Sequence, residues 1–202
     1  MIGKEFKIIM LDMDGVVNST THCNNWIINK REEYKKQYPE FDVLGTEIFQ
    51  MTRDAYQKEF NYMIELIFPD LAERITRICN ETNCYIVWSS TWRKLNEYEN
   101  IEVAKEMFNR RGLPGDRLIG YTPCVGMSWE GHCRGSEIRA WINDNIYGKV
   151  IKCAVIDDRD DAGYNLPKCA KFFQINDQVG ITEYNVEDII NYLNGDIKCL
   201  SR

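Results

Sequence analysis

Short apolar runs alternate along this chain with longer segments whose apolar residues recur every three or four positions. The runs at 8–11, 86–88, 154–156 and 172–173 are continuous and bounded by polar residues. Continuous runs of this length are typical of strands that are buried on both faces. The pattern therefore predicts a parallel sheet.

The longer segments have the spacing of amphipathic helices, with their inward positions three or four residues apart. Strands that alternate with such helices predict a layered α/β fold. A chain of 202 residues fits one domain over 1–202. The predicted helices lie at 71–79 after Pro69, at 101–108 before Gly112 and at 186–193 before Gly195.

Residues 19–63 interrupt this alternation and are rich in Tyr, Asn, Lys and Glu. We predict a small helical insertion of the cap type after the first strand. Its aromatic stripe of Phe49, Tyr56 and Phe60, with Met63 close by, fits ordinary helix packing better than a platform for base stacking.

Composition and charge narrow the classes of function. Hydrophobic residues make up 44% of the chain and charged residues 28%, which are near globular averages. No apolar run approaches the roughly 20 residues of a membrane helix, and residues 1–15 become acidic too early for a signal peptide. The net charge of −6 argues against stable binding to duplex DNA. We expect a cytoplasmic protein with no membrane association, and a small anionic substrate remains open.

Eight cysteines occur without a CxxC pair, so we expect reduced thiols. The pairs 22–23 and 132–133 each join a histidine to a cysteine, and Cys124 lies near the second pair. Their spacing matches no standard zinc pattern, and we predict no zinc site.

Two carboxylates follow the first predicted strand. Asp12 and Asp14 lie two residues apart, and Gly15 permits a sharp turn directly after them. Ligands bind outside the carboxyl ends of strands in open α/β sheets, which makes this pair a candidate catalytic site.

Small hydroxyl residues follow the second predicted strand. Ser89, Ser90 and Thr91 could donate side-chain and backbone hydrogen bonds to a phosphate. A third segment begins a helix at Arg134, where the helix N-terminus favours anions.

Four acids crowd into five positions after the strand at 154–156, at residues 157, 158, 160 and 161. Two like charges 4 Å apart repel by about 1 kcal/mol in water but by about 4 kcal/mol at an effective dielectric of about 20. Clustering inside a cleft therefore favours a bound cation, and Mg²⁺ suits carboxylate oxygens. A solvated acidic turn explains Asp160 better than it explains Asp157.

These four segments, in this order, resemble the motifs of the haloacid dehalogenase (HAD) superfamily. The motifs are DxDG, a strand ending in Ser or Thr, a Lys or Arg, and a terminal acidic cluster. The chain further resembles the HAD domain of Swiss-army-knife RNA-repair proteins and small bacteriophage HAD-like hydrolases. This resemblance lies in residues 83–93, in the Arg134 helix and in residues 172–194. The resemblance implies a three-layer Rossmann-like sheet with helices on both faces.

The resemblance also implies a Mg²⁺-dependent phosphomonoesterase that acts through an aspartyl-phosphate. Asp12 would be the nucleophile and Asp14 the general acid and base. Ser90 would bind the phosphate with Thr91 beside it, and Ser89 is the alternative after a one-residue slip. Arg134 would stand where the family usually has a lysine, with Lys152 as a fallback.

In the same comparison, the side chains of Asp12 and Asp157 and the backbone carbonyl of Asp14 would bind Mg²⁺. Asp158 would lie nearby and Asp161 would order the surrounding groups. The implied substrate is a nucleotide or a nucleic-acid 3′ or 5′ end, while the pI of about 5.1 also suits a small metabolite.

Parts of the chain beside the motifs would contact the rest of the substrate. These are Trp92, Arg93 and residues 18–26, although core packing is an equal explanation for Trp92. A binding module without activity and a phosphotransferase with the same intermediate are the alternative functions. The location would be the host cytoplasm if a phage encodes the chain, and the sequence leaves the oligomeric state open.

Overall fold

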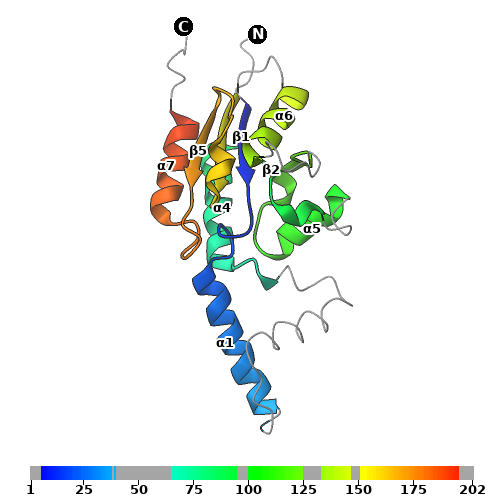
Figure 1. Cartoon of the computed structure of the whole chain (residues 1–202), viewed down its shortest axis with the longest axis vertical. Coiled ribbons are helices and arrows are strands. Elements are labelled where there is room, and N and C mark those ends of the chain that lie inside the picture. Colours follow the sequence, from blue (N-terminus) through cyan, green and yellow to red (C-terminus); the bar gives the residue numbers. More distant parts are fainter. Residues whose placement is uncertain are drawn as a thin grey trace.

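A five-stranded parallel sheet forms the centre of the protein, in the order β3-β2-β1-β4-β5 (Figure 1). The computed structural model describes residues 6–37, 39, 65–94, 100–124, 133–146 and 151–195. All four predicted strands are confirmed. The strands are β1 (Phe6–Leu11), β2 (Tyr85–Trp88), β3 (Leu118–Tyr121), β4 (Ile151–Asp157) and β5 (Ala170–Gln174).

Helices cover both faces of the sheet, which confirms the three-layer α/β fold. Successive residues of β1 face opposite sides: Ile9 and Leu11 pack with α4, α5 and α7, whereas Ile8 and Met10 pack with α6. The helices are α1 (Thr20–Gln37), α4 (Pro69–Thr82), α5 (Ile101–Arg110), α6 (Arg134–Ile146) and α7 (Glu183–Asn194). Short 3-10 helices occur at Thr91–Lys94, Gly115–Arg117 and Asp160–Gly163.

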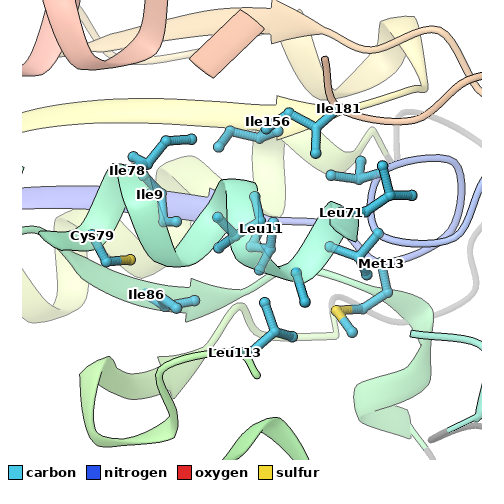
Figure 2. Close-up of a cluster of buried hydrophobic side chains, with 14 of the residues drawn as sticks. Ile9, Leu11, Met13, Leu71, Ile78, Cys79, Ile86, Leu113, Ile156 and Ile181 are labelled. Carbon is cyan, nitrogen blue, oxygen red and sulfur yellow. The ribbon is translucent and has the colours of Figure 1, made fainter. Parts of the chain in front are cut away.

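The larger core lies between the sheet and α4 (Figure 2). Ile9, Leu11 and Ile156 from the strands meet Leu71 and Ile78 from α4, and all five are fully buried. Each buried side chain of this size stabilises the fold by about 1.5–3 kcal/mol relative to an exposed one. The core therefore holds the carboxyl ends of β1 and β4 in fixed positions.

Local sequence explains why the predicted helices begin and end where they do. Pro69 occupies the first turn of α4, and Asn83 ends that helix in the left-handed region with a φ of 56°. Thr182 and Asn185 form a reciprocal capping box at the start of α7. These signals lie within a few residues of each boundary, and α4 and α7 extend past the predicted cores at 71–79 and 186–193.

The edge strand β3 was missed by the sequence analysis. Only Leu118 of its four residues is buried, and β3 pairs with β2 alone. The pairing also shifts register between Ile86 and Val87. A short edge strand with one buried side chain leaves no continuous apolar run to detect.

The insertion after β1 lies partly within the described residues. α1 extends beyond the carboxyl end of β1, away from the sheet (Figure 1). The aromatic stripe of Phe49, Tyr56 and Phe60, with Met63, lies outside the described residues, and the cap role of 19–63 stays a prediction. None of the described helices is long and apolar enough to cross a membrane.

Candidate active site

Two acid-bearing turns meet at the carboxyl edge of the sheet because β1 and β4 are neighbours. Leu11 pairs with Ile156, and the Asp12 N–H donates to the Ile156 carbonyl over 3.0 Å. Asp12 is 3% exposed and Asp157 is 1% exposed. Oxygens of Asp12, Asp157 and Asp158 all lie within 4.8 Å of one another. The structure thus brings together three of the predicted metal-binding carboxylates.

Gly15 allows the first turn to pass close to the second. Its φ is +72°, in the left-handed region that favours glycine. A Cβ at this position would lie 2.6 Å from Cγ of Asp158, closer than real Cβ atoms approach. The glycine of the motif is therefore required both by the turn and by the position of Asp158.

Ser90 faces the Asp12 carboxylate, and Ser89 faces away. The Ser89 N–H donates to the Leu11 carbonyl over 2.8 Å, which aligns the end of β2 with β1. The Ser90 hydroxyl lies close enough to Asp12 to lower the pKa of that carboxyl, in opposition to burial. The Ser89 hydroxyl instead lies 3.5 Å from the Thr122 hydroxyl, and Thr91 is exposed at the edge of this turn.

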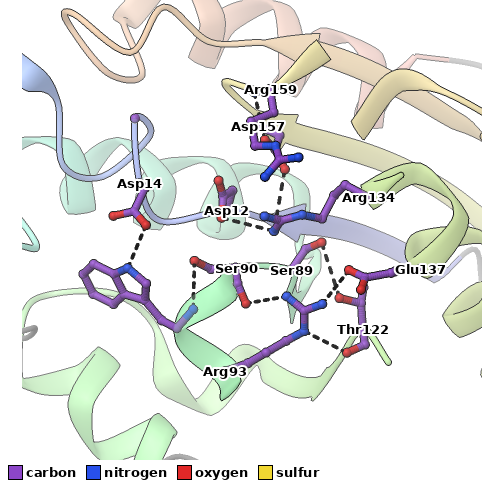
Figure 3. Close-up of polar contacts among 12 residues, drawn as sticks. Asp12, Asp14, Ser89, Ser90, Arg93, Thr122, Arg134, Glu137, Asp157 and Arg159 are labelled. Atoms are coloured by element: carbon purple, nitrogen blue, oxygen red, sulfur yellow. Dashed lines mark hydrogen bonds and ion pairs between the residues drawn. The ribbon is translucent and has the colours of Figure 1, made fainter. Parts of the chain in front are cut away.

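Arg134 reaches the site from the first residue of α6 (Figure 3). Its Nη1 lies 3.3 Å from Oδ1 of Asp12 and 3.9 Å from Oδ2 of Asp157. The guanidinium is buried, so these charges interact with little screening. The fallback cation Lys152 lies near the opposite end of β4, where its Nζ donates to the Leu193 carbonyl. The fold brings Arg134 to the acids and excludes Lys152.

Negative charge exceeds positive charge in this buried cluster. Burial raises the pKa of Asp12, and Arg134 only partly opposes that shift. Burial and the neighbouring Asp12 raise the pKa of Asp157 to about 8. No hydrogen bond from the described residues reaches Oδ2 of Asp157. A buried carboxylate oxygen without a donor beside two further carboxylates fits a hard divalent cation such as Mg²⁺.

Asp158 and Asp161 play different structural parts in the second turn. Burial raises the pKa of Asp158, whose carboxyl group faces the cluster. Asp161 instead accepts two hydrogen bonds from the Arg159 guanidinium and one, over 3.0 Å, from the Arg134 N–H. Burial alone would raise the pKa of Asp161, but these donors outweigh it and lower the pKa. Asp161 therefore ties the acidic turn to the start of α6.

Asp14 is exposed, and two side chains hold its carboxylate. Trp92 Nε1 donates to Oδ2 over 2.9 Å, and Asn18 Nδ2 donates to Oδ1 over 3.0 Å. From the sequence we expected Trp92 and Asn18 near the substrate or, for Trp92, equally in the core. Their bonds to Asp14 were not expected, because no spacing rule relates an indole to an acid in a distant turn.

Arg93 is enclosed by protein groups and is not placed to contact a substrate. Its side chain is 2% exposed and pairs with Glu137 of α6 over 2.5 Å. Its Nε donates to the Thr122 carbonyl over 3.0 Å, and its Nη1 donates to the Ser90 carbonyl. The expectation of a substrate contact is wrong for Arg93, because its guanidinium is enclosed by the protein and pairs there with Glu137.

The histidine and cysteines considered above for a zinc site do not lie together, as far as the structure describes them. His22 lies between the Ser19 hydroxyl and the Asp70 carboxylate, at 2.7 and 3.2 Å. Cys124 is exposed, and His132 lies outside the described residues. Within the described part of the chain, the acidic group at β1 and β4 is the one cluster with metal-ligand geometry.

A parallel sheet in this order, with acidic turns after two adjoining strands and a serine and an arginine facing them, defines a HAD-like protein. The chain belongs to the family described as the HAD domain in Swiss Army Knife RNA repair proteins, whose model matches residues 8–186. It is similar in structure to the HAD domain of the effector protein Lem4 from Legionella pneumophila. That pair shares 15% identity, over 95% of this chain and 97% of the other, with a TM-score of 0.48. No similar sequence was found among curated proteins.

Proposed function

We propose that this protein is a Mg²⁺-dependent phosphomonoesterase that hydrolyses its substrate through an aspartyl-phosphate on Asp12. One observation carries the proposal. The Asp12 carboxylate is buried among a hydroxyl, a guanidinium and two further carboxylates, those of Ser90, Arg134, Asp157 and Asp158. Membership of the HAD family supports the same chemistry.

The metal would be held by the side chains of Asp12, Asp157 and Asp158 and by the backbone carbonyl of Asp14. When bound, Mg²⁺ supplies positive charge that reduces the repulsion between a phosphate and the attacking carboxylate. Asp161 would keep the acidic turn in place through its bond to the Arg134 N–H. This assignment is supported by Oδ2 of Asp157, which no hydrogen-bond donor of the described residues reaches.

The reaction would use two carboxylates in turn. Asp12 attacks phosphorus while Asp14 gives a proton to the leaving oxygen as the P–O bond breaks. Water then attacks the phosphorus of the aspartyl-phosphate and gives a proton to Asp14, and the Asp12 carboxylate is released. Ser90, Thr91 and Arg134 would donate hydrogen bonds to the phosphoryl oxygens.

A nucleotide or a nucleic-acid 3′ or 5′ end is the proposed substrate class. The support is the family description, which places such domains in RNA repair proteins. The net charge of −6 favours a single phosphorylated end over the backbone of a long duplex.

The test is the release of inorganic phosphate from p-nitrophenyl phosphate and a panel of nucleotides, with and without Mg²⁺. Asp12→Asn should lower kcat by at least about 10³-fold, since removing a nucleophile eliminates the covalent step. Mass spectrometry must exclude deamidation of the new asparagine. Trapping of a phosphorylated wild-type chain after rapid acid quench would report the intermediate directly.

Asp160→Asn is the matched control, because Asp160 is an exposed acid of the same turn that contacts Tyr164 and not the cluster. It should retain wild-type activity. Activity that survives unchanged in Asp12→Asn refutes the proposal. Added alcohols or nucleosides distinguish hydrolysis from transfer, because transfer would yield a phosphorylated acceptor.

A further inference from the structure

The Asp14 carboxylate is oriented by donors from two different segments. Trp92 Nε1 binds one oxygen and Asn18 Nδ2 binds the other. Asp14 is exposed, so a free side chain at this position would rotate in solvent. Two directed hydrogen bonds on opposite oxygens restrict both of its torsion angles, as the bond drawn to Asp14 in Figure 3 illustrates for one side.

Trp92 itself is held rigidly. Its side chain is 3% exposed and belongs to the same core cluster as Met13 and Trp88. Its backbone N–H lies 3.4 Å from the Ser90 hydroxyl oxygen, which ties the ring to the turn that faces Asp12. An indole has only two side-chain torsions, and packing in a core fixes both. The indole N–H is therefore directed at one point beside Asp14.

Asn18 is fixed by a second bond. Its Oδ1 accepts from the Gly15 N–H over 2.9 Å, so the amide nitrogen is the group that faces Asp14. Asn18 thereby links the turn after β1 to the acid in that turn. Trp92 Nε1 and Asn18 Nδ2 are donors only, so neither can take up a proton during the reaction.

We infer that Trp92 and Asn18 are positioning residues that hold Asp14 for proton transfer to the leaving oxygen. This inference rests on the proposed function and adds two residues to it. Each carboxylate oxygen has roughly two acceptor positions, and each uses one of them for its donor. Asp14 is exposed, so the remaining acceptor positions are accessible to a ligand. Correct placement of such a group is worth large rate factors.

The loss of activity on removal of the Trp92 indole should depend on the leaving group. Nitrophenolate departs without a proton, whereas the alkoxide of a nucleotide sugar requires one. The parameter to compare is kcat/KM, because it reports the first step, in which Asp12 is phosphorylated and the leaving group departs. Trp92→Phe should lower kcat/KM about 10²-fold for nucleoside 3′- or 5′-monophosphates but less than about threefold for p-nitrophenyl phosphate.

Trp141→Phe provides the matched control. It makes the same replacement at a buried tryptophan on the other face of the sheet, so any loss should be equal for both esters. Asn18→Ala is a second variant if Trp92→Phe fails to fold, and it should show the same discrimination. Equal losses for both esters in Trp92→Phe and Asn18→Ala, or no loss in either, would overturn the inference.

A second readout does not depend on activity. In protein labelled with ¹⁵N-tryptophan, Asp14→Ala should move the Trp92 indole N–H signal upfield, and Asp160→Ala should leave it in place. The chain has five tryptophans, and Trp92→Phe identifies the signal. An indole signal that ignores Asp14→Ala overturns the inference even when the wild type is active. If the wild type has no Asp12-dependent activity, the proposed function is wrong. A shifted indole signal would then show only that the hydrogen bond between Trp92 and Asp14 exists.

Discussion

Two buried ionic clusters lie side by side at the carboxyl edge of the sheet, and their partners differ. In one, Arg93 pairs with Glu137, and three backbone carbonyls, those of Ser90, Thr122 and Pro123, accept from the same guanidinium. In the other, Arg134 faces Asp12 at 3.3 Å and Asp157 at 3.9 Å, and no described donor reaches Asp157 Oδ2. The charges of the first cluster are balanced, whereas the second cluster has an excess of acid.

Under the proposed function, this difference distinguishes charged residues that hold elements together from charged residues that take part in the reaction. The Arg93 pair joins the turn of Ser90 to α6, which also carries Arg134. An ion pair that is enclosed by the protein holds elements together and offers no open position to a ligand. Burial raises the pKa of both Asp12 and Asp157, and a cation bound among these carboxylates would oppose that rise.

The largest expected effect on the free energy of unfolding comes from breaking the Arg93–Glu137 pair. Arg93→Ala would leave the Glu137 carboxylate nearly buried without a counterion, which costs about 3–5 kcal/mol in comparable buried pairs. Urea unfolding monitored by tryptophan fluorescence measures the loss. The double variant Arg93→Met with Glu137→Leu should be closer to the wild type. A loss under about 1 kcal/mol in Arg93→Ala would show that the pair is not structural.

Mg²⁺ should stabilise the protein through the cluster of Asp12, Asp157 and Asp158. Mg²⁺ at about 100 times its dissociation constant should stabilise the wild type by about 2.7 kcal/mol, since it binds only the folded state. Asp157→Asn removes a ligand and should abolish most of this gain in melting temperature. Asp160→Asn keeps the cluster intact and should respond like the wild type. If all three proteins gain equally, the cation binds elsewhere.

The smallest expected effect is the pH dependence of the metal-free protein. The pKa of Asp157 is raised to about 8 in the folded state, above the roughly 3.9 of an unfolded aspartate. The folded state therefore binds more protons between these values, and stability falls as the pH rises. The free energy of unfolding should decrease by about 2 kcal/mol from pH 6 to pH 8.

The Asp157→Asn variant is the comparison for this pH series, because an amide does not titrate. Its free energy of unfolding should change less over the same interval, and Mg²⁺ should flatten the wild-type curve. A wild-type curve parallel to that of Asp157→Asn would show that Asp157 does not hold a proton in the folded state.

Local sequence was sufficient for most of the fold. The strands around Ile9, Ile86 and Ile156 were predicted because continuous apolar runs require burial on both faces. The helix boundaries at Pro69 and Thr182 depend on nearby residues alone. The acids Asp12 and Asp157 were found because a strand that ends in carboxylates is visible in the chain itself.

Tertiary structure decided how those groups face one another. The choice of Ser90 over Ser89 depends on the register of β2 against β1, since neighbouring residues point to opposite sides. The choice of Arg134 over Lys152 depends on which end of β4 meets α6. Sequence spacing determined which residues end a strand. Contacts between distant elements determined that Trp92 holds Asp14 and that Arg93 is enclosed, and spacing does not encode such contacts.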